Sequence, residues 1–326
     1  MKSPRFLQIH HEDSAAVRDE LLAGLRAPRA HTSPKYLYDA LGSRLFEAIT
    51  ELPEYYPTRT EAQIFAAHGA AMAQCVPRGA TLIDLGAGNC NKAAALFARF
   101  APAHYVAVDI SVEFLRNALE CLQRQHPDLQ MTGMGLDFSA GLQLPAEAAL
   151  GATQPRILFY PGSSIGNFTP DEALGFLRTV HAACGSATGH TPGSGLLIGV
   201  DLVKGTAELE AAYDDALGVT AAFNRNLLLH INRLTGTDFA LADWRHLARY
   251  DTTLDRIEMH LVASRSLQVR WPDGERGFSA GETIHTEISC KWTLERFESL
   301  LRAAGFGPPQ AWCDAQQRFA VFWAPA

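Results

Sequence analysis

Two glycines and a distant acidic residue mark the first place in the chain where ligand chemistry is expected. The run Asp84-Leu85-Gly86-Ala87-Gly88 directly follows a short apolar segment, and Asp109 ends the next one, 23 residues beyond Gly86. Glycine lets the backbone approach a ligand closely, and a carboxylate at the end of the second strand can accept hydrogen bonds from ribose hydroxyls. The spacing predicts a nucleoside-binding turn formed by Gly86, Gly88 and Asp109. The plainer alternative is a tight turn without a ligand.

The residues after the second glycine indicate which nucleoside fits. A dinucleotide fold needs a third glycine where this chain has Asn91, and a phosphate-binding P-loop needs Ser or Thr directly after Lys92. S-adenosyl-L-methionine carries no pyrophosphate and needs neither, so the turn favours this donor and leaves a nicotinamide oxidoreductase as a distant alternative. Asp137 and Phe138 follow the third predicted strand. We expect them beside the adenine, with the carboxylate near its amino group and the ring stacked on it.

A second loop that could do chemistry leaves the fourth predicted strand. It reads Tyr160-Pro161-Gly162-Ser163-Ser164-Ile165-Gly166-Asn167. Reactive groups in open α/β sheets lie beyond the carboxyl ends of the strands, so this loop should face the methyl donor. It lacks the Asn/Asp-Pro-Pro-Tyr/Phe run that is common in enzymes methylating nucleobase amino groups, which weakens a base-flipping interpretation. Asn167 can both donate and accept hydrogen bonds. Its plainer interpretation is a residue that flanks a helix and caps backbone groups.

Alternating strands and helices must position these two loops. Strands are predicted over residues 81–85, 104–109, 156–160 and 195–201, with helices between them. Thr169-Pro170-Asp171-Glu172 has the pattern of a capping box with Pro at the first helical position, and Thr58-Arg59-Thr60-Glu61 is interpreted as an earlier capping box. The alternation predicts βαβ units and a mostly parallel sheet.

The alternation stops after residue 202. Residues 206–240 are predicted to be helical, residues 256–289 to be strands joined by a turn at 272–274, and residues 293–304 and 318–323 to be a last helix and strand. We therefore expect one α/β domain formed by residues 60–202 and 286–326. An insert interrupts it and forms a second domain with the N-terminal segment (residues 1–59 and 203–285).

Composition narrows the class of protein. The chain has 326 residues, of which 47% are hydrophobic and 19% charged, which is globular composition for about two domains. A net charge of −7 disfavours a nucleic-acid partner. No apolar run reaches the ~18 residues of a membrane span and no export signal is recognisable, so we expect no membrane partner and a cytoplasmic location. The six cysteines form no C-x-x-C pair, so we predict neither a metal site nor a disulfide framework.

Several longer stretches resemble the histidine-specific N-alpha-methyltransferases of ergothioneine biosynthesis. The matching residues are 35–46, 49–61, 162–167, 211–215, 219–226 and 286–291. The runs Leu-Pro-Glu-Tyr-Tyr-Pro-Thr-Arg and Glu-x-Ser-Cys-Lys are specific, because general methyltransferases lack both. The resemblance covers nearly the whole chain, from about residue 34. In two places the chain departs from its relatives: Cys90 and Asn91 replace Ser or Thr and an acidic residue before Lys92, and Tyr160-Pro161 replaces an aliphatic residue before Gly162.

The resemblance implies a fold, a reaction and a set of site residues. The fold is a class I S-adenosylmethionine-dependent methyltransferase (Rossmann-like, mostly parallel sheet) with a second, α+β domain that closes over L-histidine. The reaction is trimethylation of the α-amino group of L-histidine to the betaine hercynine, the first step of ergothioneine biosynthesis. Gly86, Lys92, Asp109, Asp137 and Phe138 would hold the donor; Asn167 and Tyr213 the substrate carboxylate; Glu287, Ser289 and Tyr55 the imidazole; Tyr38 and the Gly162 backbone would lie by the reacting amine.

The residue types at 287 and 289 suit an imidazole. A carboxylate accepts an N–H, a hydroxyl pairs with the other ring nitrogen, and strand alternation puts both side chains on one face. Such a pocket rejects Phe or Leu, because its polar groups would be left unpaired. Taken alone, Glu287 could be a solvated strand residue, and the three tyrosines could be packing residues. Two alternatives stay open: an N-methyltransferase for another, aromatic amino acid, and a non-catalytic sensor of the donor or amino acid. We expect a monomer.

Overall fold

The computed structural model describes residues 2–9, 14–138, 141–142, 144, 154–186 and 189–326. The chain divides into two compact units. The first unit comprises Met1–His11, Pro57–Val203 and Trp292–Ala326, and the second comprises Glu12–Tyr56 and Lys204–Lys291. These bounds differ from the expected ones at two places. The N-terminal strand belongs to the first unit because it pairs with the parallel sheet, and residues 286–291 belong to the second because their strand pairs antiparallel within it.

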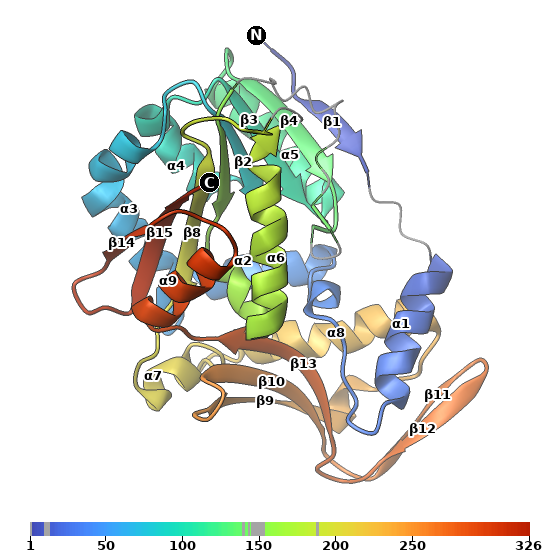
Figure 1. Ribbon diagram of the computed structural model, residues 1–326. Coiled ribbons are helices and arrows are strands. Elements are labelled where there is room, and N and C mark those ends of the chain that lie inside the picture. Colours follow the sequence, from blue (N-terminus) through green and yellow to red (C-terminus); the bar gives the residue numbers. More distant parts are fainter. Residues whose placement is uncertain (1, 10–13, 139–140, 143, 145–153, 187–188) are drawn as a thin grey trace. The chain divides into compact units, whose positions relative to one another are not determined.

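The first unit is built on an eight-stranded sheet (Figure 1). Its order is β1 (Arg5–Gln8), β4 (Gln130–Gly135), β3 (His104–Asp109), β2 (Thr81–Leu85), β5 (Arg156–Tyr160), β8 (Gly195–Asp201), β15 (Phe319–Pro325) and β14 (Gln310–Cys313). Only β15 runs against its neighbours, so the expected mostly parallel sheet is confirmed. Chain order reverses at β2, because β3 and β4 lie on one side of it and β5 and β8 on the other. This switch point is where open α/β sheets bind ligands.

Helices cover both faces of this sheet, which explains why the central strands β2, β5 and β8 are buried along almost their whole length and are rich in apolar residues. The helices α3 (Tyr56–Cys75), α4 (Asn91–Phe100) and α5 (Val112–Gln125) contribute apolar residues to one core cluster with the sheet. The helices α6 (Pro170–Ala183) and α9 (Leu294–Ala303) lie in front of the sheet in Figure 1. A 3₁₀ helix, η3 (Ser164–Asn167), precedes α6, and β6 (Gly185–Ser186) and β7 (Gly189–His190) form a short separate pair.

The second unit combines helices with a small antiparallel sheet, as an α+β domain does. Its sheet has the order β13 (Thr283–Cys290), β10 (Arg256–Ala263) and β9 (Trp244–Asp251), and β11 (Leu267–Trp271) and β12 (Gly274–Phe278) form a hairpin. Its helices are α1 (Ser14–Arg26), η1 (Pro34–Leu37), α2 (Ala40–Thr50), α7 (Thr206–Ala211), α8 (Val219–Thr235) and η4 (Leu241–Asp243). The single helical stretch expected over residues 206–240 is therefore wrong in part. Gly218 (φ 75°) begins α8 and Gly236 (φ 72°) ends it.

Candidate active site

The glycine turn after β2 is fixed by the carboxylate that ends β3. Gly86 and Gly88 have φ angles of 73° and 52°, which favour glycine. The Gly88 amide donates to Asp109 Oδ2 over 2.9 Å, and the Ser111 amide donates to Oδ1 over 2.8 Å. Burial raises the pKa of Asp109, and these amide hydrogen bonds oppose that rise. The structure thus brings Gly86, Gly88 and Asp109 together as the sequence predicts.

The segment after β4 lies beside the same turn. Asp137 is buried, and the ring of Phe138 lies close to Gly86, where an added Cβ would meet its Cζ at 3.7 Å. Phe138 is supported by Tyr160, whose ring centroid is 5.7 Å away at an angle of 84°. Tyr160, one of the two departures from the relatives, is itself buried and packs 5.1 Å from the ring of Phe176 on α6. Tyr160 therefore forms part of the core beside Phe138.

Lys92 and Gly162 meet at a residue that the sequence did not single out. Glu61 is 1% exposed; its Oε2 accepts from Lys92 Nζ over 2.7 Å, and its Oε1 accepts from the Gly162 amide over 2.8 Å. The capping box expected at 58–61 is wrong, because α3 begins at Tyr56 and Glu61 lies in its second turn, facing the interior. The run Thr-Arg-Thr-Glu in the family-like segment was the available signal, but its Glu was given a local partner instead of a distant one.

The loop that carries Asn167 is pinned at both ends. Ser163, in the left-handed region with φ 59°, accepts the Asp201 amide on its Oγ over 2.8 Å. The expected capping box at the start of α6 is confirmed: the Thr169 hydroxyl accepts from the Glu172 amide, and Glu172 accepts the Thr169 amide over 2.8 Å. Asn167 ends η3 between these two fixed points. It belongs to the first unit, together with Gly162.

Tyr213, Ser289 and Lys291 form a closed polar triangle in the second unit. The Tyr213 hydroxyl donates to Ser289 Oγ over 2.8 Å, and Lys291 Nζ donates to Ser289 Oγ over 2.8 Å and to the Tyr213 hydroxyl over 3.0 Å. Lys291 is only 1% exposed, and its ammonium lies 4.8 Å from the Tyr213 ring centroid. Lys291 ends the Glu-x-Ser-Cys-Lys motif, but the motif alone assigns it no role, because one partner is Tyr213, distant in sequence, and the other is Ser289 on the preceding strand.

Glu287 faces the same side of β13 as Ser289. Ser289 pairs with Ile257 and Glu287 with Met259, but His260 pairs with His285, so Thr286 is an extra residue in the ladder. Such a bulge re-aims neighbouring side chains. Thr286 closes it by donating its hydroxyl to the Met259 carbonyl over 3.1 Å.

The Glu287 carboxylate is buried but has an unused acceptor. It is 7% exposed, and its Oε2 has no hydrogen-bond partner among the described residues. Burial raises the pKa of Glu287 to about 7, although the Lys291 charge lowers it in part. An unpartnered buried carboxylate is costly, so this oxygen is placed to accept a ligand donor.

Aromatic rings connect the tyrosines expected at the substrate. The Tyr55 and Tyr213 centroids are 6.2 Å apart, and Phe46 lies 6.1 Å from Tyr55 and 5.5 Å from Tyr38. Phe223 of α8 lies 5.5 Å from Tyr38. The structure therefore collects Tyr38, Tyr55 and Tyr213 in one aromatic cluster of the second unit, and Tyr213 joins that cluster to the polar triangle.

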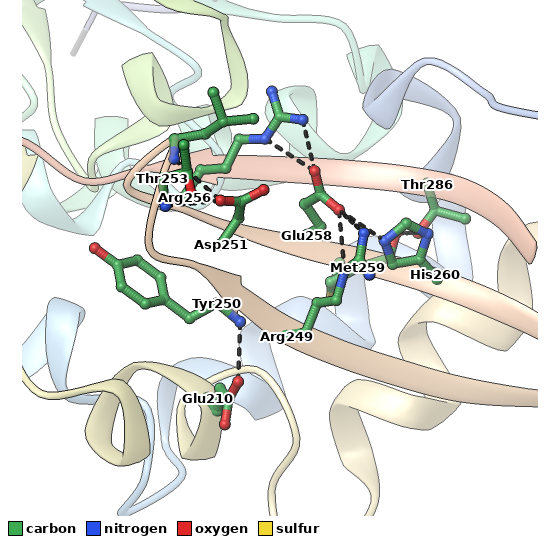
Figure 2. A network of polar contacts seen from close by, with 11 residues as sticks. Glu210, Arg249, Tyr250, Asp251, Thr253, Arg256, Glu258, Met259, His260 and Thr286 are labelled. Atoms are coloured by element: carbon green, nitrogen blue, oxygen red, sulfur yellow. Dashed lines mark hydrogen bonds and ion pairs between the residues drawn. The ribbon is translucent and has the colours of Figure 1, made fainter. Parts of the chain in front are cut away.

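The opposite face of β10 carries a separate ionic network. Figure 2 shows Glu258 receiving hydrogen bonds from Arg249 (2.7 Å) and Arg256 (2.5 Å), with the His260 ring nitrogen at 3.1 Å. Burial would raise the pKa of Glu258, but these partners outweigh burial and lower the pKa to about 2. Met259 lies between Glu258 and His260 in sequence and pairs with Glu287, so alternation keeps this network on the other face from Glu287.

The described residues offer neither a metal site nor a membrane-spanning helix. Among the residues that the structure describes, no group of three or more His, Cys, Asp or Glu could hold a metal ion. Within the same part of the chain, none of the helices is both long enough and apolar enough to span a membrane.

The fold and the site together define a class of protein. In the first unit's sheet, the strands in the spatial order β4-β3-β2-β5-β8-β15-β14 have the topology of class I S-adenosylmethionine-dependent methyltransferases. Of these strands, β15 alone is reversed, and the glycine turn lies at the switch point. A family model described as "Histidine-specific methyltransferase, SAM-dependent" matches residues 17–326. The chain belongs to this family.

Curated relatives agree with that membership. The chain is 39% identical over 318 residues to the histidine N-alpha-methyltransferase of Mycolicibacterium smegmatis, covering 95% of both chains. It is 37% identical over 312 residues to the protein of the same name from Mycobacterium tuberculosis, covering 94% of both. It is 31% identical over 283 residues to ergothioneine biosynthesis protein 1 of Neurospora crassa, covering 85% of this chain and 31% of that longer one.

Proposed function

We propose that this protein transfers three methyl groups from S-adenosyl-L-methionine to the α-amino group of L-histidine, giving the betaine hercynine in the first step of ergothioneine biosynthesis. The family and the names of its relatives support this reaction. The observation that carries the substrate assignment is the buried pair of Glu287 and Ser289, because few side chains other than imidazole present two complementary nitrogens to an acceptor and a donor. The reducing cytoplasm suits its six free thiols.

The first unit has the groups that the donor needs. Each oxygen of Asp109 accepts one amide and keeps a lone pair, which suits the two ribose hydroxyls. Phe138 beside Gly86 offers a ring face for the adenine, and Asp137 offers an acceptor for its amino group. Lys92 offers a cation to the carboxylate of the donor. When bound, S-adenosyl-L-methionine supplies a methyl group on a positively charged sulfonium.

The hydrogen bonds that Ser289 already makes determine whether it donates to a ligand or accepts from it. Its oxygen accepts from the Tyr213 hydroxyl and from Lys291, so both lone pairs are occupied and only its own proton is left to offer. Ser289 is therefore the donor of the pair, and Glu287 Oε2 is the acceptor. A neutral imidazole has one N–H and one bare nitrogen, which match these two groups. The Lys291 ammonium sets this pattern, so we assign it the positioning of Ser289 and Tyr213.

The amine end is assigned to aromatic and amide groups. We assign Tyr38 and the Gly162 backbone to the reacting nitrogen, and Asn167 to the carboxylate. Tyr213, which the resemblance also implies at the carboxylate, donates its only hydroxyl proton to Ser289, so we assign it to hold Ser289 and not to donate to the carboxylate. An unperturbed tyrosine titrates near ~10, so Tyr38 suits orientation of the amine, or of a water that takes its proton, better than direct proton removal. A trimethylated product keeps its positive charge, and aromatic rings such as Tyr38 and Tyr55 attract quaternary ammonium groups.

Mass spectrometry of the purified protein with S-adenosyl-L-methionine and a pool of the twenty amino acids tests this function. Histidine alone should gain three methyl groups, and Glu287→Ala should abolish or relax that choice. Methylation of an aromatic amino acid in place of histidine would overturn the imidazole assignment and leave the donor site standing. Donor binding with no methylated product would favour the sensor alternative.

A further inference from the structure

Glu61 lies where three segments of the first unit converge. It comes from α3, its partner Lys92 from the first turn of α4, and Gly162 from the loop after β5. Each carboxylate oxygen has one partner, and the side chain of Lys92 is 35% exposed while that of Glu61 is 1% exposed. In this ion pair the Glu61 carboxylate is thus buried, whereas the Lys92 side chain is partly exposed and accessible to a ligand.

Two glycines leave the space that this pair occupies. A Cβ at Gly199 on β8 would lie 2.1 Å from Glu61 Oε1, and a Cβ at Gly162 would lie 2.9 Å from Lys92 Nζ. Real Cβ atoms do not approach polar atoms so closely, so side chains at either position would displace the pair. Gly162 also has a φ of 78°, which only glycine adopts freely. The position of the ion pair therefore depends on a glycine of β8 and on a glycine of the loop after β5.

The charges of Glu61 and Lys92 also act on Asp84, near the end of β2. Burial raises the pKa of Asp84 to about 7; the charges of Asp109 and Glu61 add to that rise, while the Tyr105 hydroxyl and Lys92 oppose it. The charged groups at this edge of the sheet therefore influence one another's pKa. The positive charge of Lys92 is balanced by the Glu61 carboxylate even without a ligand. A buried carboxylate is weak evidence for stability, since apolar groups of the same volume often serve as well. A role in ligand binding accounts for this buried charge better than a contribution to stability does.

The donor and its product differ by one charge. S-adenosylmethionine carries a sulfonium, an ammonium and a carboxylate, for a net charge of +1, whereas S-adenosylhomocysteine has lost the sulfonium charge and is neutral. A lone Lys92 would attract the carboxylate of both but would repel the sulfonium of one. A Lys92 balanced by Glu61 keeps its hydrogen-bonding geometry without that net repulsion.

We propose that Glu61 is a positioning residue of the donor site: it fixes Lys92 and the Gly162 amide, and it cancels the Lys92 charge so that the site binds the cationic donor well relative to its neutral product. The proposal rests on the donor half of the proposed function and not on histidine. Its measure is the ratio of the dissociation constants of S-adenosylmethionine and S-adenosylhomocysteine, which a merely structural role would leave unchanged.

Isothermal titration of both ligands, without histidine, tests the proposal in the full-length protein. Glu61→Gln can still accept the Gly162 amide but leaves Lys92 unbalanced, so the ratio should rise by ~10-fold in favour of the product. Lys92→Gln leaves the opposite charge and should lower the ratio. The double variant Glu61→Gln/Lys92→Gln restores neutrality, so its ratio should return to within about threefold of the parent, even if both ligands bind more weakly.

Glu298→Gln is the matched control, since it removes a carboxylate from an exposed pair with Arg302 in the same unit. It should leave the ratio unchanged. Equal weakening of both ligands in Glu61→Gln would overturn the charge role, as would a double variant that keeps the ratio of Glu61→Gln. If Glu61→Gln does not fold, as judged by circular dichroism, the opposite shift in Lys92→Gln still decides. Absence of histidine methylation would not affect these ratios, so the two proposals fail separately.

Discussion

Burial of the Glu287 carboxylate lowers the stability of the folded protein, which indicates that the residue is present for ligand binding. Its carboxylate is buried, one oxygen lacks a partner among the described residues, and its pKa is raised to about 7 chiefly by burial. The charged form is therefore penalised in the folded state. Sites that bind ligands often give up stability in this way, and substitutions there separate stability from function.

We predict that Glu287→Gln stabilises the ligand-free protein at pH 8 and weakens histidine binding. The folded pKa of about 7 lies above the ordinary 4.5, so this residue's contribution to stability is fully present below pH 4.5 and is lost as pH rises through 7. The neutral variant avoids that loss, which is worth about 3 kcal/mol at pH 8. Denaturant unfolding at pH 8 and pH 4 measures it.

The difference between the parent and Glu287→Gln should be close to zero at pH 4, where both side chains are neutral. Histidine affinity should fall ~10-fold, because a charge-assisted acceptor is replaced by an amide. A variant that is less stable than the parent at pH 8 would contradict the prediction, since it would mean that the carboxylate is well satisfied in the absence of a ligand.

At the scale of single elements, the bulge in β13 links local sequence to the site. Thr286 is fully buried, and its hydroxyl holds the Met259 carbonyl across the irregular step between the two strands. Glu287 follows directly in the chain. The orientation of the carboxylate therefore depends on an interaction that neither strand makes alone.

We expect Thr286→Val to lower the free energy of unfolding by about 1 kcal/mol, because it removes one buried hydrogen bond at constant volume. It should also raise the dissociation constant for histidine several-fold, since the bulge that aims Glu287 is loosened. Thr286→Ser keeps the hydroxyl and is the control for binding. Calorimetric titration with histidine checks both variants, and equal affinities in Val and Ser would show that the hydroxyl does not aim the carboxylate.

Elements were predictable where their signals are local. The runs at 81–85, 104–109, 156–160 and 195–201 coincide with β2, β3, β5 and β8, because buried parallel strands are continuously apolar. No strand was predicted at β1 or β9. The first is only four residues long, and the second lacks the strict alternation of apolar and polar residues that indicates a strand, so it is identified only by its pairing with β10.

Site residues divide in the same way. The glycine turn and Asp109 follow from their spacing, and the confirmed capping box at Thr169 follows from a local motif. Glu61 and Lys291 could not be given roles, because their partners lie elsewhere in the chain: Lys92 and Gly162 for the first, Tyr213 for the second. A sequence motif can indicate that such a residue matters, but its hydrogen-bond partner is known only from the three-dimensional structure.

The whole molecule consists of two units with separate cores, and the chain passes from one unit to the other four times, near residues 12, 57, 204 and 292. The first unit contains the residues that we propose for the donor, and the second contains those that we propose for the imidazole, as well as the ionic network of Figure 2. Stability and ligand binding can therefore be perturbed in one unit at a time. The Glu258 network offers such a probe, because it lies on the face of β10 away from Glu287.

Glu258→Gln should lower the free energy of unfolding at pH 7 by about 2 kcal/mol, a figure reduced for the exposure of Arg249. The folded pKa of about 2 lies below the ordinary 4.5, so the carboxylate stabilises the protein above pH 4.5, and this contribution disappears as pH falls through 2. The parent and the variant should thus differ most at neutral pH and converge in acid. Glu275→Gln, at an exposed pair with Arg270, is the control. Urea unfolding from pH 7 to pH 2 measures the trend; a difference that persists at pH 2 would place the effect in packing and not in the charge of Glu258.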